Sequence, residues 1–174
     1  ATGTKLVNIS MTANGNYQGV NAANANSKGI SINAGITTNG ALTLNGTNKT
    51  TTTGFGVDIN GAVSAASVSA TGTASTDIAV RVRNTITSTS GEVYLKGTTV
   101  TGSSGIYTSS NITSAGNVTL DGTATTGVAG GGAVSNNAAI SGQTISVIGT
   151  NSLGYGVFQG SGASISGTAV TLNG

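Results

Sequence analysis

The chain has 174 residues, of which 6% are charged and 3% aromatic, and it contains no histidine, cysteine, proline or tryptophan. Imidazole and thiolate chemistry is therefore excluded, and we expect no catalytic site, no bound metal and no cofactor. The net charge of +2 comes from six scattered lysines and arginines, and no apolar run reaches the length of about 18 residues that a spanning helix needs, so neither nucleic acid nor membrane insertion is expected.

The first forty residues follow the later pattern only loosely. LVNISMTANG at 6–15 looks like a copy of the anchor strand that recurs from residue 40 onward. The segment that follows, YQGVNAANANSKGISI, carries extra residues before the pattern settles. We therefore expect an irregular coil or a longer loop at about 12–29, with the loop itself within 21–29.

A short alternating strand that ends in glycine recurs from residue 40 onward. Its clearest copies are GALTLNG at 40–46, GEVYLKG at 91–97 and GNVTLDG at 116–122. The second inward residue of each copy is its anchor, and the anchors are Leu44, Ala70, Leu95, Leu120, Val147 and Leu172. Their spacings of 26, 25, 25, 27 and 25 residues indicate one solenoid coil per repeat.

Two further sets of apolar residues keep step with the anchors. The first set stands seven to nine positions earlier and comprises Ile36, Val63, Ile86, Ile112, Ile140 and Ile165. The second stands roughly six positions further back and comprises Ile30, Val57, Val82, Ile106, Val134 and Val157. Three apolar segments per coil, separated by glycine, asparagine and serine, predict three strands joined by turns.

Strands are favoured over helices because the local period is two, as where Val80 and Val82 are flanked by arginines. The inward residues are mostly β-branched, and glycine at this density would cost about 0.5–1 kcal/mol per residue in a helix. The sequence therefore predicts an all-β fold, a three-sided parallel β-helix of about six coils of about 25 residues. Residues 1–174 would form one such segment, and its unprotected strand edges favour a fragment of a longer solenoid.

The same alignment predicts which charges face each other on neighbouring coils. Asp58 and Arg83 both stand twelve positions before an anchor, and Lys96 and Asp121 both stand one position after an anchor. Each pair should therefore stack between adjacent coils, as exposed ion pairs that mark the register.

The motifs GFGV at 54–57 and GYGV at 154–157 look like a ligand loop that occurs twice. Neither has the glycine spacing of a dinucleotide fingerprint, and the repeat instead makes their glycines corner residues. Val57 and Val157 should then share one interior column, four coils apart. Phe55, Tyr155 and Tyr17 would lie at coil corners, either packing over a strand end or forming a weak sugar-binding stack.

The acidic residues are too dispersed for a polysaccharide-cleaving enzyme, which needs two carboxylates close together on one face. They are Asp58, Asp77, Glu92 and Asp121, in four different columns or coils. A ladder of threonines follows the anchor glycines, at Thr47, Thr73, Thr98, Thr123 and Thr150. We interpret it as turn-lining hydroxyls, because an ice-binding face would need a second outward threonine on most coils.

The strands GALTLNG, GNVTLDG and GTAVTLNG, the coil of about 25 residues and the surface rich in Gly, Asn, Thr and Ser resemble filamentous-haemagglutinin-type exoproteins. These are adhesins and contact-dependent inhibition proteins that Gram-negative bacteria export by two-partner secretion. The resemblance implies a right-handed parallel β-helix on the cell surface or secreted from the cell. Some members carry sugars on N-x-[ST] sequons, so it also implies glycan acceptors at Asn8, Asn45, Asn48, Asn111 and Asn117.

The primary hypothesis is a structural, non-enzymatic shaft segment of a surface adhesin or filament. Its partners would be neighbouring coils of the same longer chain, with end-to-end or lateral self-association as a further option. A second hypothesis is a binding module that contacts a host glycan or protein through the irregular coil or the aromatic corners. A third is a polysaccharide-active β-helix enzyme, which would depend on Asp58 or Asp121.

Overall fold

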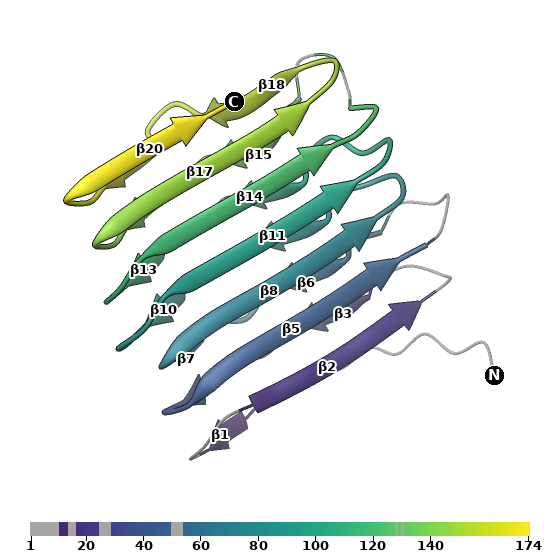
Figure 1. The fold of residues 1–174 in the computed structure, drawn as a ribbon. Coiled ribbons are helices and arrows are strands. Elements are labelled where there is room, and N and C mark those ends of the chain that lie inside the picture. The colour runs from purple at the N-terminus through teal and green to yellow at the C-terminus, as the bar shows by residue number, and fades with distance from the viewer. Residues whose placement is uncertain (1–10, 14–16, 25–28, 50–53, 128, 130) are drawn as a thin grey trace.

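The computed structural model describes residues 11–13, 17–24, 29–49, 54–127, 129 and 131–174. These residues form twenty β-strands and no helix. The strands lie in three parallel sheets that stack into a β-solenoid of about six turns (Figure 1). The predicted fold class, an all-β three-sided parallel solenoid, is therefore confirmed.

Each coil passes through the three sheets in the same order. Sheet A consists of β1 (Met11–Ala13), β4 (Ile36–Thr38), β7 (Val63–Ala65), β10 (Ile86–Ser88), β13 (Ile112–Ser114), β16 (Ala139–Ser141) and β19 (Ser164–Ser166). Sheet B consists of β2 (Tyr17–Asn24), β5 (Ala41–Asn48), β8 (Ser67–Ala74), β11 (Val93–Thr99), β14 (Val118–Ala124), β17 (Thr144–Asn151) and β20 (Ala169–Asn173). Sheet C consists of β3 (Ile30–Ile32), β6 (Val57–Ile59), β9 (Val80–Val82), β12 (Ile106–Thr108), β15 (Gly132–Asn136) and β18 (Tyr155–Gln159).

Sheet A contains the set of apolar residues that begins at Ile36. Its members are register partners on successive strands, and those from Ile36 to Ile140 are buried while Ile165 is partly buried. Met11 pairs with Ile36, so β1 belongs to sheet A and not to the anchor strands of sheet B. The expectation of an anchor strand at 6–15 is therefore wrong for Met11–Ala13, and residues 6–10 and 14–15 lie outside the described residues.

Sheet B contains the six anchors as one column of register partners. The first five are fully buried, and burying each leucine or valine stabilises the fold by about 1.5–3 kcal/mol. Leu172 is 54% exposed because it lies on β20, which pairs with β17 and has no described strand on its other edge. The strands run past the recurring glycine, to Asn48 in β5 and Ala74 in β8, so the expectation that they end there is wrong.

The glycines of sheet B occupy an inward column because another backbone passes directly over them. They are Gly46, Gly72, Gly97, Gly122 and Gly149, and they are register partners. A Cβ atom at Gly72 would meet the carbonyl oxygen of Ala79, and one at Gly97 would meet that of Gly105, both far inside van der Waals contact. The backbones of sheets B and C are therefore so close at this column that no side chain fits between them.

Sheet C stacks Val57, Val80, Ile106, Val134 and Val157 as successive register partners. The prediction that Val57 and Val157 share one column four coils apart is confirmed. The expected place of Val82 in this column is wrong, because Val80 occupies it and Val82 pairs with Ile59. The slip of two residues preserves the alternation, so Val82 is still buried.

The corners explain this slip. From sheet C to sheet A the step is four positions in every described coil but the last, as from Ile59 to Val63 and from Val82 to Ile86. In the last coil it is six positions, from Gln159 to Ile165. From sheet B to sheet C the step varies, from seven positions between Gly72 and Ala79 to eleven between Gly122 and Ala133. Counting from the anchors therefore cannot fix the register of sheet C.

The irregular segment expected at about 12–29 falls mostly on strands or outside the described residues. Residues 17–24 form β2, whose pairing with β5 shifts register between Tyr17 and Val20. Residues 14–16 and 25–28 lie outside the described residues. The part of the expected loop at 21–24 is therefore strand, and the remainder stays a prediction.

Candidate functional site

The outer face of sheet C carries a buried carboxylate. Asp58 lies at the centre of β6, where the alternation of the strand directs its side chain outward. It is nevertheless 0% exposed. Arg81, its register partner on β9, donates from Nε to Oδ1 at 2.9 Å and from Nη2 to Oδ2 at 2.8 Å. This bidentate geometry is the strong form of an arginine–carboxylate pair, and it compensates the desolvation of the carboxylate.

The predicted partner of Asp58 was Arg83, which lies two residues after Arg81 and directly after the end of β9. Arg83 is not the register partner, and its Nη2 lies 3.5 Å from Oδ2 of Asp58, with the arginine side chain 46% exposed. It donates from Nε to the side-chain oxygen of Asn60 instead. The stacked pair Asp58–Arg83 is therefore corrected to Asp58–Arg81, while the stacked pair Lys96–Asp121 is confirmed, with Nζ to Oδ2 at 3.2 Å.

Amides extend this polar cluster along the corner between sheets C and A. Asn60 donates from Nδ2 to Oδ2 of Asp58 at 3.1 Å and to Oδ1 of Asn33 at 2.9 Å. Ser31 donates to the same oxygen of Asn33 at 3.0 Å. The cluster ties together three consecutive coils, so its chemistry is that of a coil-to-coil clamp.

The ring of Phe55 covers the arginine of this clamp. The Cζ atom of Arg81 lies 3.4 Å from the ring centroid, a cation–π arrangement that shields the guanidinium from water. Phe55 is half-buried at the corner before β6. Of the two roles expected for this aromatic, packing over the strand end therefore describes its position.

A hollow of about 350 Å³ lies further along the same face of sheet C. It is lined by Ile78, Ser103, Ser104, Tyr107, Gly131, Gly132, Ser135, Asn137 and Phe158. Tyr107, Ser135 and Phe158 are register partners on β12, β15 and β18, in the same outward column as Asp58 and Arg81. We call this hollow the sheet C cleft, and sequence analysis did not find it because its residues come from four coils.

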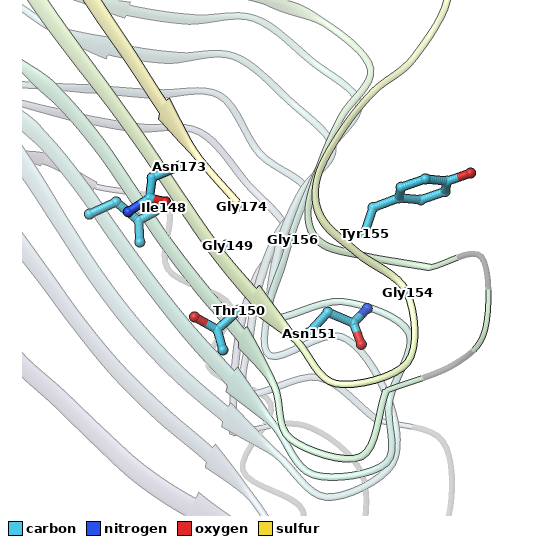
Figure 2. A pocket seen from close by; sticks show the side chains of 9 residues that line it. All are labelled: Ile148, Gly149, Thr150, Asn151, Gly154, Tyr155, Gly156, Asn173 and Gly174. Carbon is cyan, nitrogen blue, oxygen red and sulfur yellow. The ribbon is translucent and has the colours of Figure 1, made fainter.

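A second hollow, of about 540 Å³, lies at the last coil (Figure 2). Four of its nine lining residues are glycines, and none of the nine has a charged side chain. Of its two asparagines, Asn151 already donates to the carbonyl of Gly131 at 2.8 Å and accepts from the amide of Leu153 at 3.0 Å. The side chain of Asn151 is therefore already used within the protein.

The other two corner aromatics lie in different surroundings. Tyr155 begins β18, is 57% exposed and has its ring centroid 5.9 Å from that of Phe158. Its position two residues before Val157 matches that of Phe55 before Val57, so these two share a corner. Tyr17 lies on β2 in sheet B, which corrects its expected place at that corner.

The four sequon asparagines that the structure describes do not lie on one surface. Asn45 faces outward and is half-buried in β5, whereas Asn48 on the same strand is 1% exposed, so a glycan there would require its side chain to leave the core. Asn111 and Asn117 are exposed, and their side-chain oxygens accept from the backbone amides of Ala139 and Thr144 on the next coil. Asn8 lies outside the described residues.

The four acidic residues lie on different elements of the fold. Asp58 is on sheet C, whereas Asp121 is on sheet B and pairs with Lys96. Asp77 accepts from the amide of Ile78, and Glu92 is exposed. Among the described residues, no group of three acidic side chains could hold a metal ion.

The threonine ladder is one outward column of sheet B, from Thr47 to Thr150. It lies within the strands, so its interpretation as turn-lining hydroxyls is wrong. Tyr94 and the Lys96–Asp121 pair lie in neighbouring outward columns and interrupt the small side chains. The face therefore lacks the uniform flatness that an ice-binding surface needs.

Comparison with protein-family models, with curated proteins and with solved structures yields no match. The described part of the chain offers no helix of the length and apolar character that a membrane crossing requires. The structure shows the parallel β-helix repeat that the resemblance to filamentous-haemagglutinin-type exoproteins implied. Membership of that family stays a proposal.

Proposed function

We propose that this chain is a structural shaft segment of a secreted or surface-exposed bacterial adhesin or filament, non-enzymatic, acting by extension and presentation. The observation that carries the proposal is the continuous register of three parallel sheets around one narrow core. Each coil packs on its two neighbours, so added coils lengthen the molecule without changing its cross-section. A stalk needs this property.

The surface chemistry supports the same role. The outward columns carry mainly threonine, serine and asparagine, and the charged residues of sheets B and C pair across coils at Asp58–Arg81 and Lys96–Asp121. Two of the four carboxylates, those of Asp58 and Asp121, are used in these pairs and lie on separate sheets, which favours a non-enzymatic role over polysaccharide cleavage. The anchor motifs resemble those of two-partner-secretion adhesins, which is the reason for proposing export to the cell surface.

A surface-display experiment tests the shaft function. The chain is placed between an outer-membrane anchor and a binding domain, and adhesion of the cells to ligand-coated beads is measured. Leu95→Asp places a charge in the fully buried anchor column and should collapse the rod, so adhesion should fall severalfold. Thr98→Asp, on the same strand but in an outward column, is the matched control and should leave adhesion unchanged.

Two results would contradict the proposal. Adhesion that is equal in the Leu95→Asp and Thr98→Asp variants would mean that the folded rod does not present the tip. Polysaccharide turnover by the purified chain, abolished by Asp121→Asn, would mean that it is an enzyme.

A further inference from the structure

We propose that the sheet C cleft is a binding site for a neutral saccharide, with room for one or two sugar rings. This site is separate from the shaft function, which rests on the core columns. Its volume of about 350 Å³ is at the lower end of small-molecule sites, about 300–1,000 Å³. The ligand class follows from the walls, the floor and the charge of the cleft.

Two aromatic rings form the walls. Tyr107 and Phe158 stand on β12 and β18 with one strand, β15, between them, which separates their Cα atoms by about 9.5 Å at the usual strand spacing. Ser135 on β15 is the only side chain between them in that column. A flat ring that contacts both walls at about 3.5–4.0 Å needs a gap of this order, and the apolar face of a pyranose meets that requirement.

Hydroxyl groups and backbone form the floor. Ser135 donates to the carbonyl of Gly132 at 3.2 Å, and its Oγ lies 3.1 Å from that of Ser104. When Ser104 donates to Ser135, both hydroxyl hydrogens are used within the protein, and the remaining lone pairs are acceptors. Hydroxyl groups of a sugar are donors that match such a floor.

Gly132 lies where the aromatic wall of Phe158 meets the floor at Ser135. A Cβ atom there would approach the Cβ of Phe158 at 2.7 Å and the Oγ of Ser135 at 2.9 Å. Glycine therefore lets the aromatic wall and the floor meet without a third side chain between them. The neighbouring outward positions carry Ile78 and Asn137, an apolar contact and an amide at the rim.

The cleft carries no charge, which distinguishes a neutral sugar from an anionic one. None of the nine lining residues is an aspartate, glutamate, histidine, lysine or arginine. Arg81 is the next residue in the column beyond Tyr107, but its guanidinium is held by Asp58 and covered by Phe55. An acidic glycan would therefore find no free cation among these residues.

Ligand-observed NMR on the full chain tests this site, with maltose, cellobiose and lactose as neutral probes and sialyllactose as the anionic probe. At least one neutral disaccharide should give saturable magnetisation transfer with a weak dissociation constant. Tyr107→Ala and Phe158→Ala should each lower the affinity at least tenfold. Ser135→Leu should abolish binding with both rings in place, because its side chain fills the gap.

Tyr94→Ala is the matched control, since Tyr94 is an outward, half-buried tyrosine on sheet B, and it should bind as the unaltered chain does. Circular dichroism of each variant should give the β-sheet content of the unaltered chain, which separates loss of binding from loss of folding. The proposal is overturned if no neutral probe binds, if Tyr107→Ala and Ser135→Leu bind as the unaltered chain does, or if sialyllactose binds more tightly than lactose. None of these results bears on the shaft function, which the display experiment measures.

Discussion

Arg81 holds Asp58 through two hydrogen bonds of 2.9 and 2.8 Å between adjacent coils, and it does so beneath the ring of Phe55. The carboxylate is fully buried and the arginine side chain is 17% exposed. Because removing one partner leaves a charge in low dielectric, Asp58→Asn should lower the free energy of unfolding by about 3–5 kcal/mol. Urea denaturation followed by circular dichroism measures this loss.

The same substitution at Asp121 provides the matched control. Asp121 also pairs with a cation on the neighbouring coil, but Lys96 is 48% exposed and solvent screens the pair. Asp121→Asn should therefore leave the unfolding midpoint nearly unchanged. Equal losses in the two variants would contradict the role assigned to the buried clamp.

The choice of Arg81 over Arg83 gives a second prediction. A double-mutant cycle between Asp58→Asn and Arg81→Gln should show a coupling energy above about 1 kcal/mol, because the two groups share two hydrogen bonds. The cycle with Arg83→Gln should show a smaller coupling, because that contact is a single one of 3.5 Å. A larger coupling energy with Arg83 than with Arg81 would favour the register that places Arg83 opposite Asp58.

From residue 36 onward, the registers of sheets A and B could be predicted from the sequence because their apolar residues recur with little change in spacing. Sheet C was misplaced at one coil because VRV at 80–82 offers two valines of the same parity, and the corner before it varies in length. Counting four positions back from Ile86 would have selected Val82 as the partner of Ile59, and hence Arg81 as the partner of Asp58. The corner of four positions, which recurs in every described coil but the last, was the available signal.

The continuation of the sheet B strands beyond glycine was hidden for a different reason. After Gly72 and Gly97 the alternation continues in small residues, such as Thr73 and Ala74, whose hydropathy hardly differs between the two faces. Turn propensity therefore outweighed the period of two. Only the close passage of sheet C shows why glycine occupies an inward strand position.

The glycine column gives the third prediction. Gly97→Ala should destabilise the fold by at least about 1–3 kcal/mol, because its Cβ would clash with the backbone oxygen of Gly105, which cannot rotate away. Gly35→Ala is the control, since its Cβ would have one ordinary contact, 3.6 Å from the oxygen of Ala62. There the loss of unfolded-state entropy should leave stability unchanged or raise it by up to about 1 kcal/mol. Thermal unfolding of both variants decides whether the column is a packing requirement.

The fourth prediction concerns Lys96. Its hydrogen bond with Asp121 and the Coulomb attraction of that carboxylate raise the pKa of Lys96 above its ordinary value of 10.5. The stabilisation that accompanies a raised lysine pKa is fully present below the pKa of the unfolded state. It is lost as the pH rises through the pKa of the folded state. NMR titration should give a lower pKa for Lys96 in Asp121→Asn, and the difference should shrink in about 1 M salt. An unchanged pKa in that variant would remove the assigned cause.

The sheet C cleft could not be predicted because its parts become neighbours only after the register is known. Tyr107, Ser135 and Phe158 are separated by 28 and 23 positions in the chain, and no motif links them. Once the column is aligned, the order arginine, tyrosine, serine, phenylalanine places a small residue between two rings. The sequence signal therefore exists, but it runs across coils and not along the chain.

The last prediction measures the coil spacing directly. Thr37 and Ser141 lie in one outward column of sheet A, four register steps apart, and Ser166 lies one step further. Because the chain has no cysteine, Thr37→Cys combined with Ser141→Cys or Ser166→Cys allows selective spin labelling. The Cα separations are about 19 and 24 Å, and the labels' own length cancels in the difference of about 4.8 Å. Pulsed electron–electron double resonance should give narrow distance distributions whose means differ by this increment. Broad distributions, or equal mean distances for the two pairs, would show that the coils do not stack as a rigid rod.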